Sequence, residues 1–459
     1  MGPRWKLLVE GLGKIERAEV EVHPLMLFVG ENNSGKSYLA TLLWGLLSMH
    51  DMAQPKQNSA IYKSCDTWLK ARLARRDRSF AHVLSEEERA RLVALFNEGL
   101  RDNILPFTEA IFNQPGVRLS FAEVSSLDRE FSPVLRFKPI PSDKGPYMSH
   151  GWLQGAGFEL AIRRSYPLDS DTRSNLLHAL SVYAVFGDKV GSGWPEAFWG
   201  SYNNRDPLLL PASRTGFMLL YKSTVRQQIG QLRKARTVRD AGVDLTTPAI
   251  QFLDLLAVGM DTKTGQYADE ASFLEAPLRG QVELTQGVGV NEYRFHPAGS
   301  DAHLSMALSS SLVTELAPII LVLRHMNDFP VLILEEPEAH LHPKMQRHLA
   351  RTIVRLIRKG LYVWITTHSE NFCQQINNFL KIGNSPKRAT LQQKLGYEPQ
   401  EYLTSDDVSG YQFTLEGDKS RVTELKKRKS GLVMPTFNHE LTALTKETLS
   451  LQRETAGEE

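Results

Sequence analysis

The sequence is poor in cysteine and contains no long hydrophobic run. Its 459 residues include two cysteines, Cys65 and Cys373, which are too few for a disulfide framework and too far apart for a zinc motif. We therefore expect a protein of the reducing cytoplasm. The longest apolar run, residues 316–323, has about half the length that a membrane-spanning helix needs. Residues 1–16 lack the apolar centre of a signal peptide, so no membrane partner is expected.

Net charge is also nearly absent. The sequence has 54 lysines and arginines against 52 acidic residues, a formal charge of +2, with 42% hydrophobic and 23% charged residues. These proportions are typical of a soluble globular protein and exclude collagen-like, low-complexity and fibrous chains. At about 150 residues a domain, the length favours two or three domains. A balanced charge indicates no particular partner, so local motifs must decide the function.

Residues 30–37, GENNSGKS, fit the phosphate-binding pattern G-x-x-x-x-G-K-[ST] without a mismatch. An apolar strand pattern precedes them and an apolar helical pattern follows, which is the context that this loop requires. Glycines let backbone N–H groups wrap a phosphate, the lysine reaches the β- and γ-phosphates, and the serine hydroxyl binds Mg²⁺. A chance match has odds on the order of one in a hundred, so we expect ATP and Mg²⁺ as cofactors. The residues expected to bind the nucleotide are Gly30, Asn32, Asn33, Ser34, Gly35, Lys36 and Ser37.

Two carboxylates follow a second buried strand pattern. Residues 331–334 are aliphatic, and Glu335 and Glu336 come directly after them, at the end of a strand where open α/β sheets bind ligands. Adjacent strand residues point to opposite faces, so the two carboxylates are expected to have different roles. We expect Glu335 to bind Mg²⁺ through water, together with Ser37, and Glu336 to orient the attacking water. The alternative is a solvated acidic turn after a core strand.

The order of the elements predicts an α/β fold in which one core is assembled from both ends of the chain. A strand, the phosphate-binding loop and a helix occupy residues 25–48, and a strand–helix–strand pattern occupies residues 331–367. The segment between them is too long for one crossover connection. We expect a core from residues 1–50 and 280–400, a long and largely helical insertion with additional strands at 51–279, and a C-terminal segment at 401–459 suited to interactions.

The segment LEEPEAHLHP, followed by a helix and by WITTHS, resembles the ABC-class P-loop ATPases. The resemblance is to the branch with an AAA-type ATPase domain that contains the SMC and RecF-like DNA-repair ATPases and the OLD-like bacterial defence ATPases. The strand pair LGKIERAEVEV also looks like this branch, and the resemblance covers residues 1–50 and 305–370. It implies an ABC-type ATPase core in which residues 338–341 form the D-loop and His368 contacts the γ-phosphate. Glu336, His368 and Lys36 are then the expected catalytic residues.

Two positions depart from that family. Glu335 stands where many relatives have aspartate, and the signature motif of transporters is represented only by LSSSL at residues 308–312. If the resemblance holds, Ser309, Ser310 and Ser311 bind the γ-phosphate of ATP held by the loop of a second subunit, so a homo-oligomer is expected. The alternative is an ordinary serine-rich helix cap. The glutamine of the family's Q-loop cannot be placed.

Weaker signals leave alternatives open. Arg214 could reach phosphate or stabilise its turn, and His340 and His342 fit the D-loop better than a metal site. A basic stretch at residues 222–239 could contact nucleic acid, form a solvated helix face or bind an acidic protein. The side chains considered for nucleic acid are Arg226, Arg233, Lys234, Arg236 and Arg239.

The predicted function is slow, switch-like, Mg-dependent hydrolysis of ATP. The tail lacks the glutamate and Asp-x-Asp pair of the nuclease domain that OLD-family proteins carry, so we do not expect this chain to cut nucleic acid. Its resemblance to the ATPase subunits of the PARIS and Septu antiphage systems implies a scaffold whose ATP-driven oligomeric state controls a separately encoded effector, such as a nuclease. The alternative is a DNA-binding ATPase of repair or recombination.

Overall fold

The computed structural model describes most of the chain. The described residues are 4–74, 79–127, 133–140, 148–153, 157–163, 169–187, 189, 206–232, 245–260, 262–287, 290–428 and 431–455. Among these residues, no helix is long and apolar enough to cross a membrane.

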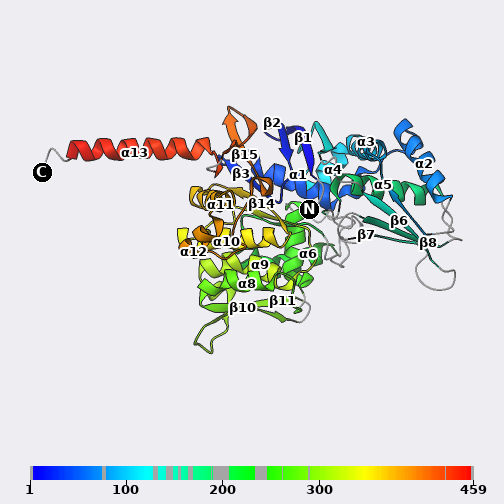
Figure 1. Ribbon diagram of the computed structural model, residues 1–459. Helices are drawn as coiled ribbons and strands as arrows, with labels where there is room; N and C mark the ends of the chain where they lie inside the picture. The colour runs from blue at the N-terminus through cyan, green and yellow to red at the C-terminus, as the bar shows by residue number, and fades with distance from the viewer. Residues whose placement is uncertain are drawn as a thin grey trace.

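A nine-stranded sheet forms the centre of the molecule (Figure 1), in the order β5-β1-β2-β16-β15-β3-β14-β13-β9. The strands from β15 to β9 run parallel, and β1 pairs antiparallel with both β2 and β5. The strands are β1 (Trp5–Leu12), β2 (Ile15–Glu21), β3 (Leu25–Gly30), β5 (Phe121–Ser126), β9 (Leu208–Leu210), β13 (Val331–Glu335), β14 (Tyr362–Thr367), β15 (Val408–Glu416) and β16 (Lys419–Glu424).

Helices cover both faces of the parallel part of this sheet. Leu25, Leu27 and Val29 of β3 join a core with α9 (Ser311–His325), α10 (Pro343–Arg358) and α11 (Glu370–Gly383). Met26 and Phe28 point to the opposite core, which includes α1 (Lys36–Ser48). Because both faces are buried, the strands read as continuous apolar runs rather than alternating ones. The predicted α/β class and the strand–loop–helix order at residues 25–48 agree with this architecture.

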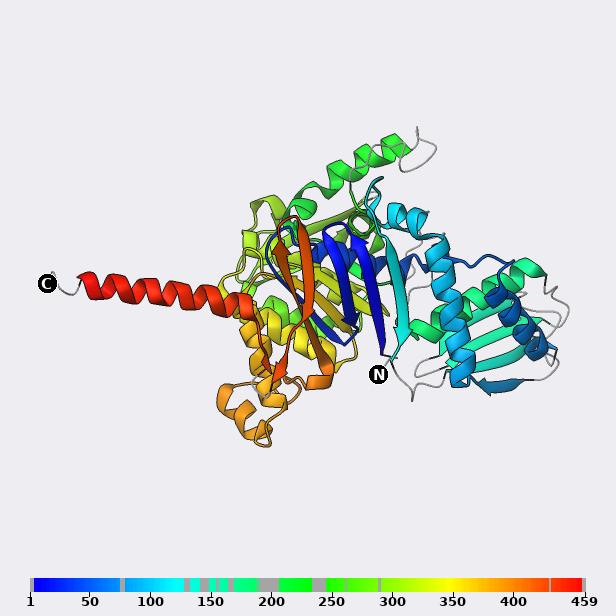
Figure 2. The same cartoon turned by 90° about the horizontal axis from the view of Figure 1, so that it is seen from above.

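A second lobe, which we call the arm, extends from one side of the core. Within the described residues it combines three helices with a four-stranded sheet in the order β4-β6-β8-β7 and has its own hydrophobic cluster. The arm lies at the end of the molecule opposite the projecting C-terminal helix α13 (Pro435–Thr455) (Figures 1 and 2). Its elements are α2 (Ala60–Leu73), β4 (Phe80–Val83), α3 (Glu86–Asp102), β6 (Val134–Ile140), β7 (Met148–Leu153), β8 (Gly157–Arg163) and α5 (Ser170–Phe186). Helix α4 (Ile104–Phe112) packs instead in the core cluster that contains α1.

The remaining elements cover the side of the core near α9. They are α6 (Arg214–Leu232), α7 (Thr247–Asp254), α8 (Ala268–Glu275), and a small sheet of β10 (Gly280–Gln286), β11 (Asn291–Pro297) and β12 (Leu304–Ser305). Helix α12 (Arg388–Leu395) precedes the last strands of the large sheet.

The segment boundaries expected from the sequence do not coincide with the large sheet. β5 and β9 come from residues 51–279, where a largely helical insertion with additional strands was expected, and β15 and β16 come from residues 401–459. β9 has only three residues, and β15 contains serine, glycine and glutamine, so neither has a strong strand pattern. Pairing with β13 and β3 over long sequence separations forms these strands, and local periodicity does not reveal such pairing. The large sheet therefore contains strands from residues 51–279 and from residues 401–424.

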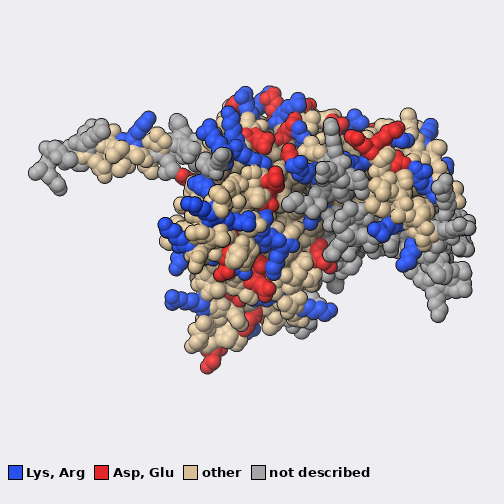
Figure 3. Space-filling view, in the orientation of Figure 1, with Lys and Arg blue, Asp and Glu red and all other residues tan. Residues whose placement is uncertain are grey.

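The basic stretch considered for nucleic acid is only partly described. Arg226 lies within α6, and Arg233, Lys234, Arg236 and Arg239 lie outside the described residues. On the face shown in Figure 3, the basic and acidic side chains of the described residues are interspersed.

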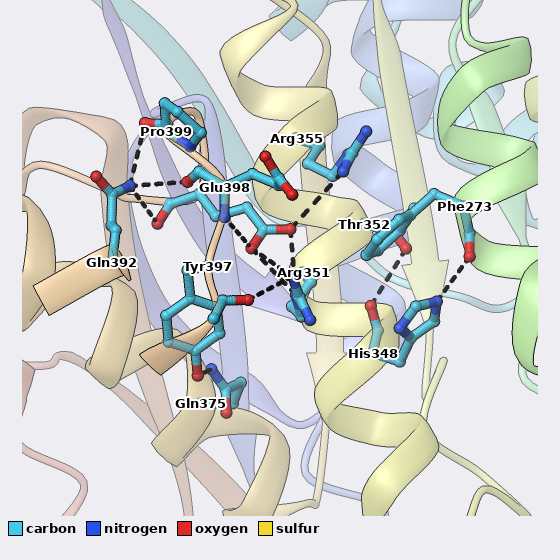
Figure 4. Close-up of polar contacts among 12 residues, drawn as sticks. Phe273, His348, Arg351, Thr352, Arg355, Gln375, Gln392, Tyr397, Glu398 and Pro399 are labelled. Carbon is cyan, nitrogen blue, oxygen red and sulfur yellow. Dashed lines mark hydrogen bonds and ion pairs between the residues drawn. The ribbon is translucent and has the colours of Figure 1, made fainter. Parts of the chain in front are cut away.

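A buried carboxylate fixes the segment after α12 against α10 (Figure 4). Glu401 is fully buried and accepts hydrogen bonds from Arg351 Nε at 3.1 Å and Arg351 Nη2 at 2.8 Å. Arg355 Nη1 lies 3.8 Å from the same carboxylate. The side-chain amide of Gln392 donates to the carbonyl oxygens of Glu398, Pro399 and Glu401. This network fixes residues 398–401, which lead toward β15, to the Arg351 and Arg355 side chains of α10.

Replacing Glu401 with alanine is expected to destabilise the fold. The change removes the carboxylate that pairs with the Arg351 guanidinium and leaves it with the Gly396 carbonyl oxygen at 3.3 Å, at a cost on the order of 3 kcal/mol. Urea unfolding of the two variants measures the effect. Glu398→Ala is the matched control, because the exposed Glu398 enters the network through its backbone, and it should shift stability by less than about 0.5 kcal/mol. Equal stability of both variants would contradict the proposed role of the network.

Candidate functional site

The phosphate-binding loop connects β3 to α1 and adopts a wrapped backbone conformation. Gly30, Asn33 and Gly35 have positive φ angles of 143°, 59° and 93°. Ser34 Oγ donates to Glu31 O at 2.7 Å, and the buried Lys36 ammonium donates to Gly30 O at 3.1 Å and Glu31 O at 2.6 Å. The Lys36 side chain therefore reaches across the loop to the carbonyl oxygens at its start. Asn32, Asn33 and Ser37 are exposed. The loop fits a phosphate group, because its exposed turn and the start of α1 present backbone N–H groups.

The loop glycines also have a packing reason that the sequence alone did not show. A Cβ on Gly30 would lie 2.1 Å from Phe413 O on β15, and one on Gly35 would lie 2.8 Å from Ile15 Cγ1 on β2. Positive φ and close neighbours therefore both require glycine here. The two contacts come from strands β15 and β2 of the large sheet, so the sheet itself shapes the loop.

The two expected carboxylates take different positions. Glu335 ends β13 and shares a hydrogen bond with the Ser37 side chain. Glu336 lies beyond the strand with φ of 43°, and its backbone N–H donates to Thr366 O at 2.9 Å. Its Oε1 lies 3.2 Å from His368 Nε2. The separation arises from this left-handed turn rather than from strand alternation.

Their environments shift the two pKa values in opposite directions. Burial raises the pKa of Glu335, and the hydrogen bond to Ser37 only partly offsets that effect. The hydrogen bond with His368 and the charges of His368 and Lys36 lower the pKa of Glu336. Glu336 is therefore ionised at neutral pH, as a group that orients water must be. A cation beside Glu335 would favour its ionised form, since nearby positive charge stabilises a carboxylate.

A fully buried arginine donates hydrogen bonds to the backbone carbonyls of both glutamates. Arg214 begins α6 and donates through Nη1 to Glu335 O at 2.6 Å and through Nη2 to Glu336 O at 3.0 Å. Its Nη2 also donates to Glu315 Oε1 on α9. Since its side chain has no exposure, Arg214 stabilises turns and does not reach phosphate. The sequence had left both roles open.

A third carboxylate, Glu338, was placed only as part of the D-loop. Glu338 is buried, and its Oε1 accepts from Thr367 Oγ1 at 2.5 Å, His368 N at 2.9 Å and Ser369 N at 3.2 Å. It therefore fixes the backbone on which His368 stands. No spacing rule for these hydrogen bonds is visible in the sequence, because they join residues about 30 positions apart.

The structure brings together one part of the predicted site and leaves another part separate. Lys36, Ser37, Glu335, Glu336 and His368 converge at the carboxyl ends of β3, β13 and β14. Ser309, Ser310 and Ser311 lie at the start of α9, where Ser310 Oγ accepts from Val313 N at 3.4 Å. Ser310 and Ser311 are exposed, and Leu308 beside them is 74% exposed. His340 and His342 do not join any group of metal-ligating side chains within the described residues.

Comparisons with known proteins locate an ATPase domain in the chain. Residues 247–373 match the family described as AAA ATPase domain. The matched segment contains Ser309, Ser310, Ser311, Glu335, Glu336 and His368, and the phosphate-binding loop lies outside it. Comparison with curated proteins gives no match. Together, the loop and the family match show an ATP-binding ATPase domain of the P-loop type.

Solved structures similar to this chain include heads of SMC proteins. An SMC head bound to the C-terminal winged-helix domain of ScpA is 14% identical, with a TM-score of 0.35, and the match covers 93% of this chain and 98% of that chain. The SMC head domain from Thermotoga maritima is 10% identical with a TM-score of 0.32, covering 92% and 98%. A head with an extended coiled coil, bound to the C-terminal domain of ScpA derived from Pyrococcus furiosus, is 13% identical with a TM-score of 0.36, covering 98% and 100%. At these values the likeness says nothing about activity or partners.

Lys36 predicts a pH dependence of ATP binding. Burial lowers the pKa of Lys36 to about 8, although Glu336 and Glu338 oppose that shift. Only the protonated lysine attracts phosphate, so affinity should be constant below pH 7 and fall as pH rises through 8. Between pH 8 and 9 we expect about fivefold weaker binding, measured by titration calorimetry. Lys36→Arg remains charged and should not show this step; the same step in that variant would assign it to another group.

Proposed function

We propose that this chain hydrolyses ATP with Mg²⁺ at the carboxyl ends of β3, β13 and β14. The observation that supports this most directly is the convergence there of a phosphate-binding lysine, a metal-binding pair and an ionised carboxylate. Lys36 would bind the β- and γ-phosphates, Glu336 would orient the attacking water, and His368 would contact the γ-phosphate. The 3.2 Å contact between His368 and Glu336 would hold the carboxylate in place before nucleotide arrives.

The residues around Ser37 fit a magnesium ion. The Ser37 hydroxyl and the Glu335 carboxylate share a hydrogen bond, and Mg²⁺ prefers such oxygen ligands together with water and phosphate. When bound, the ion would neutralise charge on the phosphates. Glu335 would hold it through water, and the fixed backbone hydrogen bond from Arg214 would keep that carboxylate at the strand end.

We further propose that two copies share each ATP molecule. Ser309, Ser310 and Ser311 lie at an exposed helix start, where hydroxyl and backbone N–H groups favour an anion. Arg214 contacts Glu315, one turn along the same helix, and also the backbone carbonyls of Glu335 and Glu336. A phosphate bound by the serines of one copy would thus be linked, through one arginine, to that copy's own hydrolytic site. ATP would favour the assembled form.

The finer function that we propose is control of a separately encoded effector in cytoplasmic antiphage defence. The resemblance of LEEPEAHLHP and the N-terminal strand pair to defence-type ATPases supports it. Assembly driven by ATP and lost on hydrolysis would be the signal, and the arm and α13 would offer surfaces for the effector. Coexpression with the neighbouring genes should lower the plating efficiency of phage, and Lys36→Ala should abolish that protection.

The proposed assembly is tested by the dependence of turnover on protein concentration. Wild-type turnover per subunit should rise with concentration, and light scattering should detect a larger mass when ATP and Mg²⁺ are added. Ser310→Arg should bind ATP yet lose both effects, because the added side chain blocks the exposed helix start. Thr390→Arg, at an exposed position of α12, is the control and should behave as wild type. Full turnover at every concentration would refute the shared site.

A further inference from the structure

A second group of polar side chains lies where α1 ends and the arm begins. α1 ends at Ser48, and a short helix, η1 (His50–Ala53), follows directly. η1 packs closely on α3, since a Cβ added to Gly99 would lie 1.9 Å from Ala53 O. The backbone of η1 is therefore held against the arm, and His50 and Asp51 are presented from a fixed position.

Three potential metal ligands meet at this junction. His50 Nδ1 lies 3.3 Å from Asp51 Oδ1, and His178 Nε2, from the middle of α5, lies 3.8 Å from the same oxygen. One ligand atom from each residue lies within 4.8 Å of the other two. Both histidines are buried, and the Asp51 side chain is 30% exposed. The group thus has a buried interior and one side that solvent reaches.

His178 is a buried polar group whose ring nitrogens lack a complete hydrogen bond to the protein. Its side chain is 3% exposed, and neither ring nitrogen completes a hydrogen bond, although the backbone of His50 lies near the ring. A neutral imidazole binds a metal ion through a lone pair on a ring nitrogen. A buried imidazole without partners costs free energy that a bound ion would recover.

We propose that His50, Asp51 and His178 bind a divalent transition-metal ion of the zinc type. Zinc bonds to imidazole nitrogen and carboxylate oxygen are about 2.0–2.2 Å long, which places tetrahedral ligands about 3.4 Å apart. The two contacts to Asp51, at 3.3 and 3.8 Å, are close to that separation. Three protein ligands leave a fourth position for water on the exposed side. Imidazole and carboxylate together favour zinc over magnesium, which prefers oxygen ligands alone.

The ion would join the nucleotide core to the arm. His50 follows the helix that starts with Lys36 and Ser37, and His178 belongs to the arm helix α5. A bound ion would therefore fix the far end of the phosphate-binding helix to the arm by direct bonds. Removal of the ion should loosen this junction without removing any residue of the nucleotide site.

Binding of Zn²⁺ to the full chain tests the proposal. Competition with a chromophoric chelator, in excess Mg²⁺ to occupy oxygen-ligand sites, should show one tight Zn²⁺ per chain, and Zn²⁺ should raise the melting temperature. Co²⁺ in its place should give the visible absorption of a tetrahedral site. His178→Gln should weaken Zn²⁺ binding at least about a hundredfold, and Asp51→Asn, a surface-side change that preserves the buried packing, should weaken it similarly.

A second, exposed group provides the control. Glu283, His296 and His303 also bring three ligand atoms together, on the small sheet, and His303→Gln should keep the tight ion. Loss of the tight ion in His303→Gln would assign it to that group and overturn the proposal. No tight Zn²⁺ in wild type, or equal binding in wild type, His178→Gln and Asp51→Asn, would do the same and leave a purely structural cluster.

Discussion

Glu336→Gln is expected to bind ATP with nearly wild-type affinity and to hydrolyse it at least a hundredfold more slowly. The phosphate-binding loop and the Ser37–Glu335 pair are untouched by the change, so nucleotide affinity should be preserved. The carboxylate that the His368 contact keeps ionised becomes a neutral amide, which accepts a proton from water far less readily. A positioned general base contributes about 10²–10⁴-fold to a rate. Steady-state phosphate release and titration calorimetry measure the two quantities.

The control for this variant is Glu31→Gln. Glu31 is exposed in the same loop, and its backbone carbonyl, rather than its carboxylate, accepts the Lys36 hydrogen bond. Its amide variant should retain turnover within about twofold. If Glu336→Gln hydrolyses ATP at the wild-type rate, Glu336 is not the group that activates water. If neither wild type nor variant hydrolyses ATP, the chain binds nucleotide as a static ligand.

The same variant separates ATP binding from hydrolysis in assembly. If two copies share ATP, Glu336→Gln should accumulate as the larger species when ATP is added, because the hydrolysis that would dissociate the assembly is blocked. Light scattering would show that mass persisting for hours in the variant and decaying in wild type. The trapped species would then be the form in which to look for an effector. If the Glu336→Gln variant stays dissociated in saturating ATP, that result would contradict the shared site.

The sequence predicted the parts of this site that depend on local pattern. The loop at residues 30–37, the strand at residues 331–335 and the pair of carboxylates after it could be read from spacing and apolar runs. Their mutual contacts, Ser37 with Glu335 and His368 with Glu336, arise from strands that are distant in the chain. The nine-stranded order was not predictable, because β9 and β15 acquire their strand character from partners rather than from their own residues.

The supporting residues were hidden for the same reason. Arg214 stood in a turn whose neighbours were unknown, and its contacts to Glu315, Glu335 and Glu336 span 101 to 122 positions. Glu338 could be assigned to a loop by resemblance, yet only the fold shows that it holds the backbone of His368 and Ser369. The group proposed to bind a zinc-type ion joins His50, after α1, to His178 of the arm helix α5. Sequence spacing identifies ligands on one element and cannot pair residues of different elements.

Arg214→Met is expected to lose both stability and turnover. Methionine matches much of the volume but leaves the buried Glu315 carboxylate with Thr215 as its remaining donor, at 2.7 Å. It also removes the Arg214 donor from the carbonyl oxygens of Pro211, Glu335 and Glu336, of which Glu336 O keeps the backbone N–H of Ala339. Removing one partner of a buried ion pair typically costs about 3–5 kcal/mol. Turnover should fall at least tenfold, because the backbone of Glu335 and Glu336 is no longer fixed, whereas ATP affinity should change little.

A double variant separates the two effects. In Arg214→Met with Glu315→Leu, no unpaired charge remains, and replacing a buried pair by apolar groups is often neutral for stability. We therefore expect urea unfolding to recover while kcat stays low, because the carbonyl oxygens of Glu335 and Glu336 still lack the Arg214 side chain that joined them. Recovery of turnover together with stability would show that Arg214 only helps the chain fold. A low kcat in a stable protein would show that Arg214 positions Glu335 and Glu336 through their backbone carbonyls. Because Arg214 also pairs with Glu315, α9 and the turn at residues 335–336 would then be held in a fixed relative position.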